Sequence, residues 1–185
     1  MFNISHTSKI SDFLISKPLT FSKAKIPAFL TALYISFLLV LIRMVAIPLP
    51  FTFVPIVFVV QAVFVLSWKL GSKKALLAVL FFLFQGSLIH LIQIGPLSGY
   101  QVGYLIAAFF IGSASQNLEK PTLLKIFLIF NFATLLMYFS GLAVLIPLLG
   151  IKKAFLTGML PFLLPDLVKN ILAVKVLEKM QKISL

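Results

Sequence analysis

Residues 123–149 read LLKIFLIFNFATLLMYFSGLAVLIPLL, a run in which Lys125 is the single charged side chain. A helix needs about 20 mostly apolar residues to cross the hydrocarbon core of a bilayer, so this run is long enough to span one. The rest of the chain has a similar character. Of its 185 residues, 61% are hydrophobic and 11% are charged, and the mean hydropathy is +1.14. A soluble domain carries roughly a quarter charged residues, so the predicted solvent of this protein is lipid.

Five further apolar runs accompany this segment, and six membrane spans are predicted. Their ranges are 28–47, 54–70, 75–94, 100–115, 123–149 and a sixth within 154–177. Pro161 and Pro165 leave two possible starts for the sixth span, near residue 154 or at Pro165, because proline is tolerated in a first helical turn but not in a helix interior. The sequence therefore predicts an all-α integral membrane protein. We expect an N-terminal segment (1–26), one six-helix transmembrane domain (27–178) and a C-terminal tail (179–185).

The net charge of +12 arises from basic residues that flank the apolar runs, which is a topology signal rather than a nucleic-acid surface. Most of them fall on one side of the membrane if both termini are cytoplasmic: Lys9, Lys17, Lys23, Lys25, Lys69, Lys73, Lys74, Lys120, Lys125, Lys175, Lys179 and Lys182. Arg43, Lys152 and Lys153 then face outward. The positive-inside rule predicts an N-in, C-in orientation.

The stretch GMLPFLLPDLVKNILAVKVL, residues 158–177, places Asp166 and Lys169 inside an apolar run. A charge in the bilayer costs roughly 2.5 to 3.5 kcal/mol on insertion scales, so the presence of two charged residues in this span has to be explained. Helical spacing puts Asp166, Lys169 and Asn170 on one face, where they would offer a ligand an acceptor, a cationic donor and an amide. Alternatively, the two charges form a structural ion pair, or the lysine reaches the interface. If the span begins at Pro165, the helix dipole stabilises the aspartate.

A second candidate is QIGPLSGYQVGY, residues 93–104, in the outer loop between the third and fourth spans. Gln93, Ser98 and Tyr100 could hydrogen-bond a small polar molecule. The alternative is a tight turn followed by interfacial tyrosines. On the first span, Ala28 and Ala32 lie one turn apart, a spacing that lets another helix approach closely in lipid.

Several classes of protein are disfavoured. The chain has no cysteine and two histidines, so neither a thiolate nor a histidine metal site is expected. No P-loop is present. Ser98 lacks both the glycine two residues earlier and the later histidine of an intramembrane serine protease, so no enzymatic activity is expected. We expect Gln61, Gln85 and Asn131 to make interhelical hydrogen bonds rather than ligand contacts.

Four segments together resemble one known family. They are IPLP (47–50), VPI (54–56), GPLSGYQVGYLIAAF (95–109) and GMLPFLLPDLVKNILA (158–173). The chain resembles BioY, the biotin-specific S-component family of energy-coupling factor (ECF) transporters. The resemblance implies an S-component bundle in the bacterial cytoplasmic (inner) membrane that captures biotin from outside. It also implies association with a transmembrane coupling protein and two ATPase subunits, and no cofactor.

The resemblance also suggests roles for particular residues. Tyr100, Asp166 and Lys169 are expected to contact biotin, with the aspartate and lysine meeting the N–H and carbonyl groups of its ureido ring. Ala28 and Ala32 are expected to dock the coupling protein. The group that binds the valerate carboxylate is left open among Gln93, Ser98 and Arg43.

The sequence departs from the family pattern at Leu97, Ser98 and Pro165, and at Val57 and Val59, where a threonine and a glutamine are common. These departures leave two alternatives. The chain could be an S-component for a different vitamin, or a membrane scaffold protein with a purely structural Asp–Lys pair.

Overall fold

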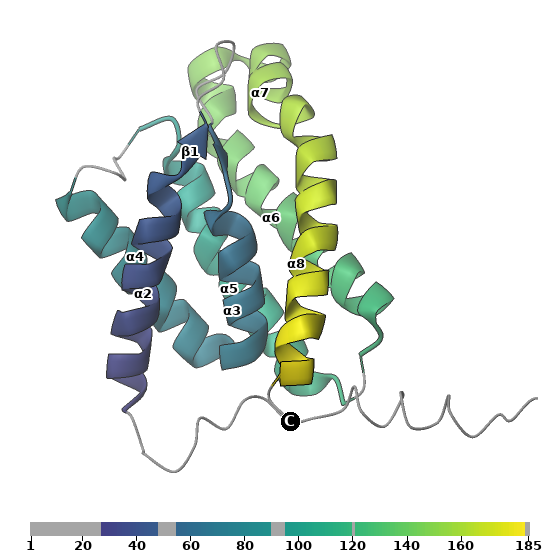
Figure 1. Ribbon diagram of the computed structural model, residues 1–185. Helices are drawn as coiled ribbons and strands as arrows, with labels where there is room; N and C mark the ends of the chain where they lie inside the picture. Colours follow the sequence, from purple (N-terminus) through teal and green to yellow (C-terminus); the bar gives the residue numbers. More distant parts are fainter. Residues whose placement is uncertain (1–26, 48–54, 90–94, 120, 184–185) are drawn as a thin grey trace, which may run out of the picture.

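The computed structural model describes residues 27–47, 55–89, 95–119 and 121–183. Within these ranges the chain forms an all-α bundle with one short β-hairpin contact, which confirms the predicted class (Figure 1). The six predicted spans correspond to α2 (Ala28–Met44), α3 (Val59–Leu70), α4 (Ser72–Leu88), α5 (Ser98–Asn117), α6 (Leu123–Leu149) and α8 (Leu163–Ile183).

The second span begins later than the apolar run predicts. Strand β2 (Ile56–Val57) follows Pro55 and pairs antiparallel with β1 (Ala46–Ile47), so that Ala46 lies opposite Val57. The helix α3 then begins at Val59 rather than at residue 54. Proline is disfavoured in a helix interior and tolerated at the start or edge of a strand, which agrees with the position of Pro55 directly before β2.

The sixth apolar run is divided rather than continuous. It contains α7 (Ile151–Gly158), a 3-10 turn η1 (Leu160–Phe162) and then α8. Pro161 lies at the start of the 3-10 turn and Pro165 in the first turn of α8, where the missing N–H breaks no helical hydrogen bond. The start of α8 at Leu163 thus falls two residues before the later of the two predicted starts. Its end at Ile183 lies within the segment predicted to be a tail.

Glycines allow α5 and α6 to pack at unusually short range. A Cβ atom on Gly103 would lie 2.8 Å from the Cα and 2.9 Å from the Cγ of Met137 on α6. One turn earlier, the Ser140 hydroxyl donates a 2.7 Å hydrogen bond to the Gly99 carbonyl. Small residues at such crossings let backbones approach closely in lipid. This contact fixes the α6 face that supplies part of the polar site described below.

Gly103→Ala is expected to destabilise the protein by about 1–3 kcal/mol, because the new methyl group overlaps backbone atoms that cannot rotate away. Thermal unfolding of the detergent-purified protein measures the change. Gly95→Ala is the matched control, since a Cβ at Gly95 meets no atom within 4 Å. Equal melting temperatures for the two variants would contradict the close crossing.

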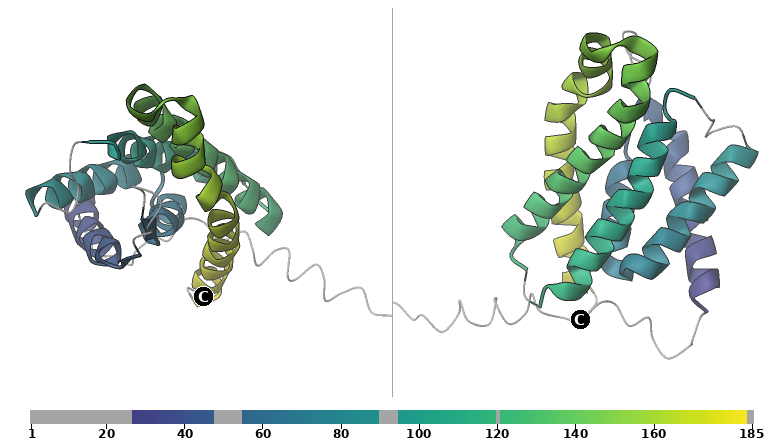
Figure 2. Two further views of the ribbon diagram at one scale, coloured as in Figure 1. Left: turned by 90° about the horizontal axis from the view of Figure 1, so that it is seen from above. Right: turned by 180° about the vertical axis from the view of Figure 1, so that it is seen from behind.

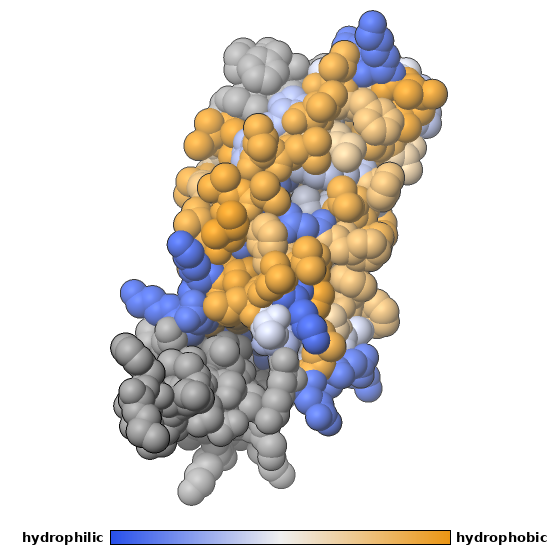
Figure 3. All heavy atoms as spheres, turned by 90° about the vertical axis from the view of Figure 1, so that its right-hand side faces the viewer, coloured by the Kyte–Doolittle hydropathy of each residue, from blue (hydrophilic) through white to orange (hydrophobic). Residues whose placement is uncertain are grey.

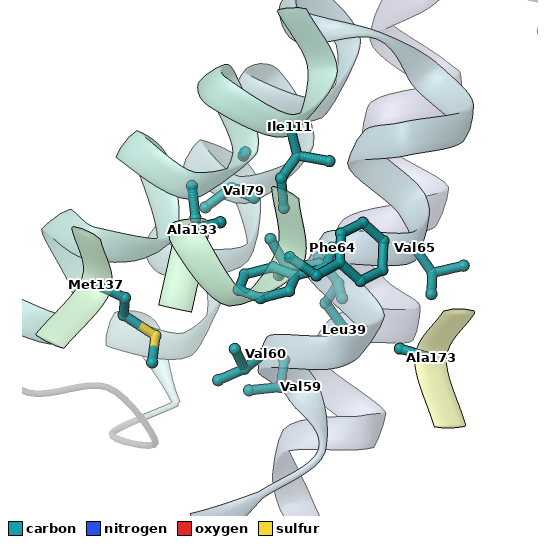
Figure 4. Packing of buried hydrophobic residues seen from close by; sticks show 14 of the residues in the cluster. Leu39, Val59, Val60, Phe64, Val65, Val79, Ile111, Ala133, Met137 and Ala173 are labelled. Carbon is teal, nitrogen blue, oxygen red and sulfur yellow. The ribbon is translucent and has the colours of Figure 1, made fainter. Parts of the chain in front are cut away.

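Aromatic and aliphatic side chains from several helices fill the centre of the bundle. The rings of Phe64 and Phe130 are fully buried and meet edge to face with centroids 5.5 Å apart. Figure 4 shows Phe64 among Leu39 of α2 and neighbouring aliphatic side chains. This core brings α3 and α6 together, and α8 lies beside both helices (Figures 1 and 2).

The outer surface of the bundle is largely apolar. Large hydrophobic side chains are exposed on every long helix, among them Tyr34, Phe84, Phe109, Phe139 and Leu164. Seen from the α8 side, hydrophobic side chains cover the middle of the molecule and hydrophilic ones gather mainly towards its two ends (Figure 3). Such a belt is expected where lipid is the solvent.

The lengths of the helices support a membrane location less strongly than the apolar surface does. In the described part of the chain, α6 is both long and apolar enough to cross a membrane, with a mean hydropathy of 2.1 in its best window. The helices α2 and α3 are apolar but shorter. The start of α2, the α3–α4 turn and the end of α8 lie at one end of the bundle, and α7 lies at the other (Figure 1). Among the lysines that the structure describes, this arrangement groups most at one end, while the N-in, C-in orientation stays a prediction.

Candidate functional site

A buried ion pair lies in the interior between α8, α6 and α3. The Lys169 ammonium contacts the Asp166 carboxylate, and the two residues are 8% and 5% exposed. The Tyr138 hydroxyl of α6 donates a short hydrogen bond to the second carboxylate oxygen of Asp166. Lys169 also donates to the Val57 carbonyl of β2, with 3.2 Å between nitrogen and oxygen. The pair therefore faces the bundle and not the lipid.

Local sequence explains how a carboxylate is tolerated here. The 3-10 turn ends at Phe162, and α8 begins at the next residue, Leu163. Asp166 lies in the first turn of α8, as predicted, so it meets the positive end of the helix dipole. The dipole, a lysine and a tyrosine hydroxyl together replace the water that the carboxylate loses.

Asn170 extends the polar cluster one turn along α8. It is fully buried, and its amide nitrogen donates to the Asn131 side-chain oxygen at 3.2 Å and to the Thr134 hydroxyl at 3.0 Å, both on α6. Its side-chain oxygen accepts from Gln61 of α3 at 3.4 Å. The predicted face of Asp166, Lys169 and Asn170 is therefore polar throughout. The interhelical hydrogen bonds predicted for Gln61 and Asn131 are confirmed.

Sequence reasoning overlooked the part that α6 plays. Tyr138 and Thr134 were not singled out, yet both contact the α8 residues directly. A signal was present, because Asn131, Thr134 and Tyr138 follow the spacing i, i+3 and i+7 that defines one helix face. Three polar side chains on one face of an otherwise apolar span point to a buried polar partner.

The loop candidates are placed differently. The Tyr100 ring is buried, and its hydroxyl donates to the Gly158 carbonyl at 2.6 Å, which ties α5 to the end of α7. The Tyr100 ring also packs against Gly141 of α6, three residues from Tyr138, since a Cβ at Gly141 would lie 2.4 Å from the ring. Ser98 is the half-buried first residue of α5, and its N–H donates to Gly95 in a turn. Gln93 lies outside the described residues.

The two alanines of α2 have different surroundings. Ala28 is exposed at the start of the helix, whereas Ala32 is 0% exposed and packs inside this chain. One turn further along α2, buried Ser36 accepts a 3.0 Å hydrogen bond from Gln85 of α4, which confirms the interhelical contact predicted for Gln85. Small residues on α2 therefore bring α2 and α4 together within the bundle.

The chemistry of the cluster suits a neutral polar guest. Each carboxylate oxygen of Asp166 can accept more than one hydrogen bond, and an ammonium group offers three donors. Inside an apolar bundle such bonds are stronger than in water, and unpaired groups are costly. A small molecule with adjacent N–H and carbonyl groups could exchange bonds with Asp166 and Lys169 without carrying charge into the interior.

Comparison with known proteins places the chain in a family. The family model described as "BioY family" matches residues 17–184, which is most of the chain. The chain belongs to the BioY family. A relative from Pyrococcus horikoshii described as "Probable biotin transporter BioY" is 32% identical over 142 residues, covering 72% of this chain and 82% of the relative. The sequence-based resemblance is confirmed.

A solved structure shares the fold. The crystal structure of "the S-component for biotin from an ECF-type ABC transporter" superposes with a TM-score of 0.72 and covers 98% of this chain and 95% of its own. Sequence identity is 18%, so this likeness shows the fold of the bundle. As a BioY family member, the chain is a membrane transport protein.

Proposed function

We propose that this chain is the biotin-binding S-component of an ECF-type uptake transporter. One observation carries the proposal: the Asp166–Lys169 pair is buried inside an apolar bundle and faced by the Tyr138 hydroxyl. Buried ion pairs add little to stability on balance, because desolvation offsets much of their attraction. A binding role explains why such a pair is kept. The descriptions of the relative and of the solved structure, both of which name biotin, support this choice of ligand.

The ligand complements the pair. The ureido ring of biotin has two N–H donors and one carbonyl acceptor, which match the carboxylate of Asp166 and the ammonium of Lys169. Its fused rings and aliphatic tail suit an aromatic and aliphatic interior. Tyr100, which packs on α6 against Gly141, stays a candidate contact of the bound ligand. Gln93, Ser98 and Arg43 stay candidates for the valerate carboxylate.

Transport requires partners that this chain does not supply. We place the protein in a bacterial cytoplasmic membrane with both termini inside, where it would capture biotin from outside. A transmembrane coupling protein and two ATPase subunits would drive release into the cytoplasm. Of the two alanines predicted to dock the coupling protein, Ala28 is exposed and could contact a partner helix. Ala32 is buried inside this chain and could act only by keeping α2 close to its neighbours.

Direct binding tests the proposal. Detergent-purified full-length protein is expected to bind labelled biotin and to melt at a higher temperature in its presence. At a hundred times the Kd, a ligand that binds only the folded state adds about 2.7 kcal/mol of stability. A panel of other vitamins at the same concentration serves as the control. Stabilisation by another vitamin but not by biotin would overturn the choice of ligand, and stabilisation by none would overturn the binding role.

A further inference from the structure

Gln61 contains an unpaired acceptor in the interior. The residue lies in the first turn of α3 and is 6% exposed. Its amide nitrogen donates to Asn170 at 3.4 Å. Its side-chain oxygen is buried, and the described part of the chain offers it no hydrogen-bond donor. Buried acceptors without donors are uncommon in folded proteins, and in the lipid core no bulk water can supply one.

The backbone of α6 determines which way this amide points. The Thr134 hydroxyl donates to the Phe130 carbonyl, and the Asn131 amide nitrogen donates to the Phe127 carbonyl. Both side chains therefore present an oxygen acceptor to Asn170. The two donors of the Asn170 amide are used there, and its oxygen must face Gln61.

Because of these hydrogen-bond directions, rotating the Gln61 amide by half a turn would not give its oxygen a donor. A rotated amide would place its oxygen against the Asn170 oxygen, which has no proton to donate. The hydrogen-bond chain thus runs from α6 through Asn170 and ends at an acceptor on α3. Because the direction is set by main-chain carbonyls, it holds whichever rotamer of the terminal amides is assigned.

The orphaned oxygen stands beside the candidate site. The Val57 carbonyl and the Gln61 amide are four residues apart and contact Lys169 and Asn170, which are neighbours on α8. Along the α3–α8 contact the interior therefore presents the Asp166 carboxylate, the Lys169 ammonium and the Gln61 oxygen. These three groups are, in that order, a hydrogen-bond acceptor, a donor and an acceptor.

We infer that Gln61 is a specificity-determining ligand contact whose side-chain oxygen accepts one ureido N–H. A ureido group presents an N–H donor, a carbonyl acceptor and a second N–H donor. These groups complement the Asp166 carboxylate, the Lys169 ammonium and the Gln61 oxygen. The inference rests on the proposed biotin-binding function and adds to it a second acceptor, which separates a cyclic urea from ligands with a single N–H beside a carbonyl.

The test compares Gln61→Met with the wild type. Methionine keeps the length of the side chain but removes both polar atoms. The orphaned acceptor then moves from Gln61 to Asn170, so the number of unpaired oxygens is unchanged and the ligand-free melting temperature should shift by no more than about 3 °C. Biotin affinity should fall by about tenfold or more, the factor expected for one lost hydrogen bond at a buried acceptor.

Gln85→Met is the matched control, because Gln85 also makes one side-chain hydrogen bond, to Ser36, and this bond joins α4 to α2 rather than to α8. It should leave biotin affinity unchanged. Biotin methylated on either ureido nitrogen provides the second readout. Wild-type protein should lose affinity for at least one methylated form relative to biotin, and Gln61→Met should show a smaller relative loss for that same form.

The outcomes separate the inference from the proposed function. If wild-type protein binds no biotin, both are wrong. If it binds biotin and Gln61→Met binds within about twofold of it, the inference is wrong and the function stands. A loss of affinity in Gln61→Met with unchanged relative affinity for both methylated forms also overturns the inference, because a merely structural glutamine would behave in that way.

Discussion

Asp166→Asn is expected to weaken biotin binding by about a hundredfold or more while the purified protein remains folded. The substitution keeps the size of the side chain but replaces a charged acceptor oxygen with an NH2 donor. A ureido N–H then meets a donor or a neutral acceptor, and charge-assisted hydrogen bonds are roughly twice as strong as neutral ones. A hundredfold change corresponds to about 2.7 kcal/mol. Equilibrium binding of labelled biotin to detergent-purified protein measures the loss.

The control for this variant is Glu178→Gln, the same carboxylate-to-amide change near the other end of α8. It should bind biotin like the wild type. Near-wild-type binding by Asp166→Asn would remove the aspartate from the ligand site. Normal vitamin uptake by cells carrying that variant would favour the alternative in which the Asp–Lys pair is purely structural.

Much of the fold follows from the sequence because lipid imposes simple rules. The run at 123–149 forms α6 with the predicted bounds, because a helix satisfies its own backbone hydrogen bonds inside a bilayer and Pro147 lies only two residues from the end of the helix. Helix starts were less predictable where prolines occur. Pro55 allows the β1–β2 pairing to replace the first turn predicted for the second span, and this pairing depends on residues more than eight positions apart.

The candidate site was predicted only in part, for a different reason. Burial cost identified Asp166 and Lys169 directly, since charges inside a span need partners. Their partners come from other helices, and helical periodicity gives no information about which faces meet. Tyr138 and Val57 therefore could not be paired with them from spacing. Tyr100 illustrates the converse, because its hydroxyl is bonded to a backbone carbonyl that no sequence pattern reveals.

Lys169→Met is expected to abolish measurable biotin binding and to lower stability clearly. It removes the donor to the ligand carbonyl and to the Val57 carbonyl, and it leaves the Asp166 carboxylate buried beside Tyr138. Removing one partner of a buried ion pair costs about 3–5 kcal/mol. Thermal unfolding and labelled-biotin binding measure the two effects. Lys175→Met is the matched control, because Lys175 is exposed on the same helix and should change neither.

The double variant Asp166→Asn, Lys169→Met separates binding from stability. Replacing a whole buried pair with neutral groups is often neutral or stabilising, because neither charge is left without its partner. The melting temperature should therefore recover most of the loss seen with Lys169→Met. Biotin binding should not recover, since both ligand-facing charges are gone. A double variant that regained binding together with stability would show that the pair only holds α8 against α6 and α3, and the ligand would then have to be sought elsewhere in the bundle.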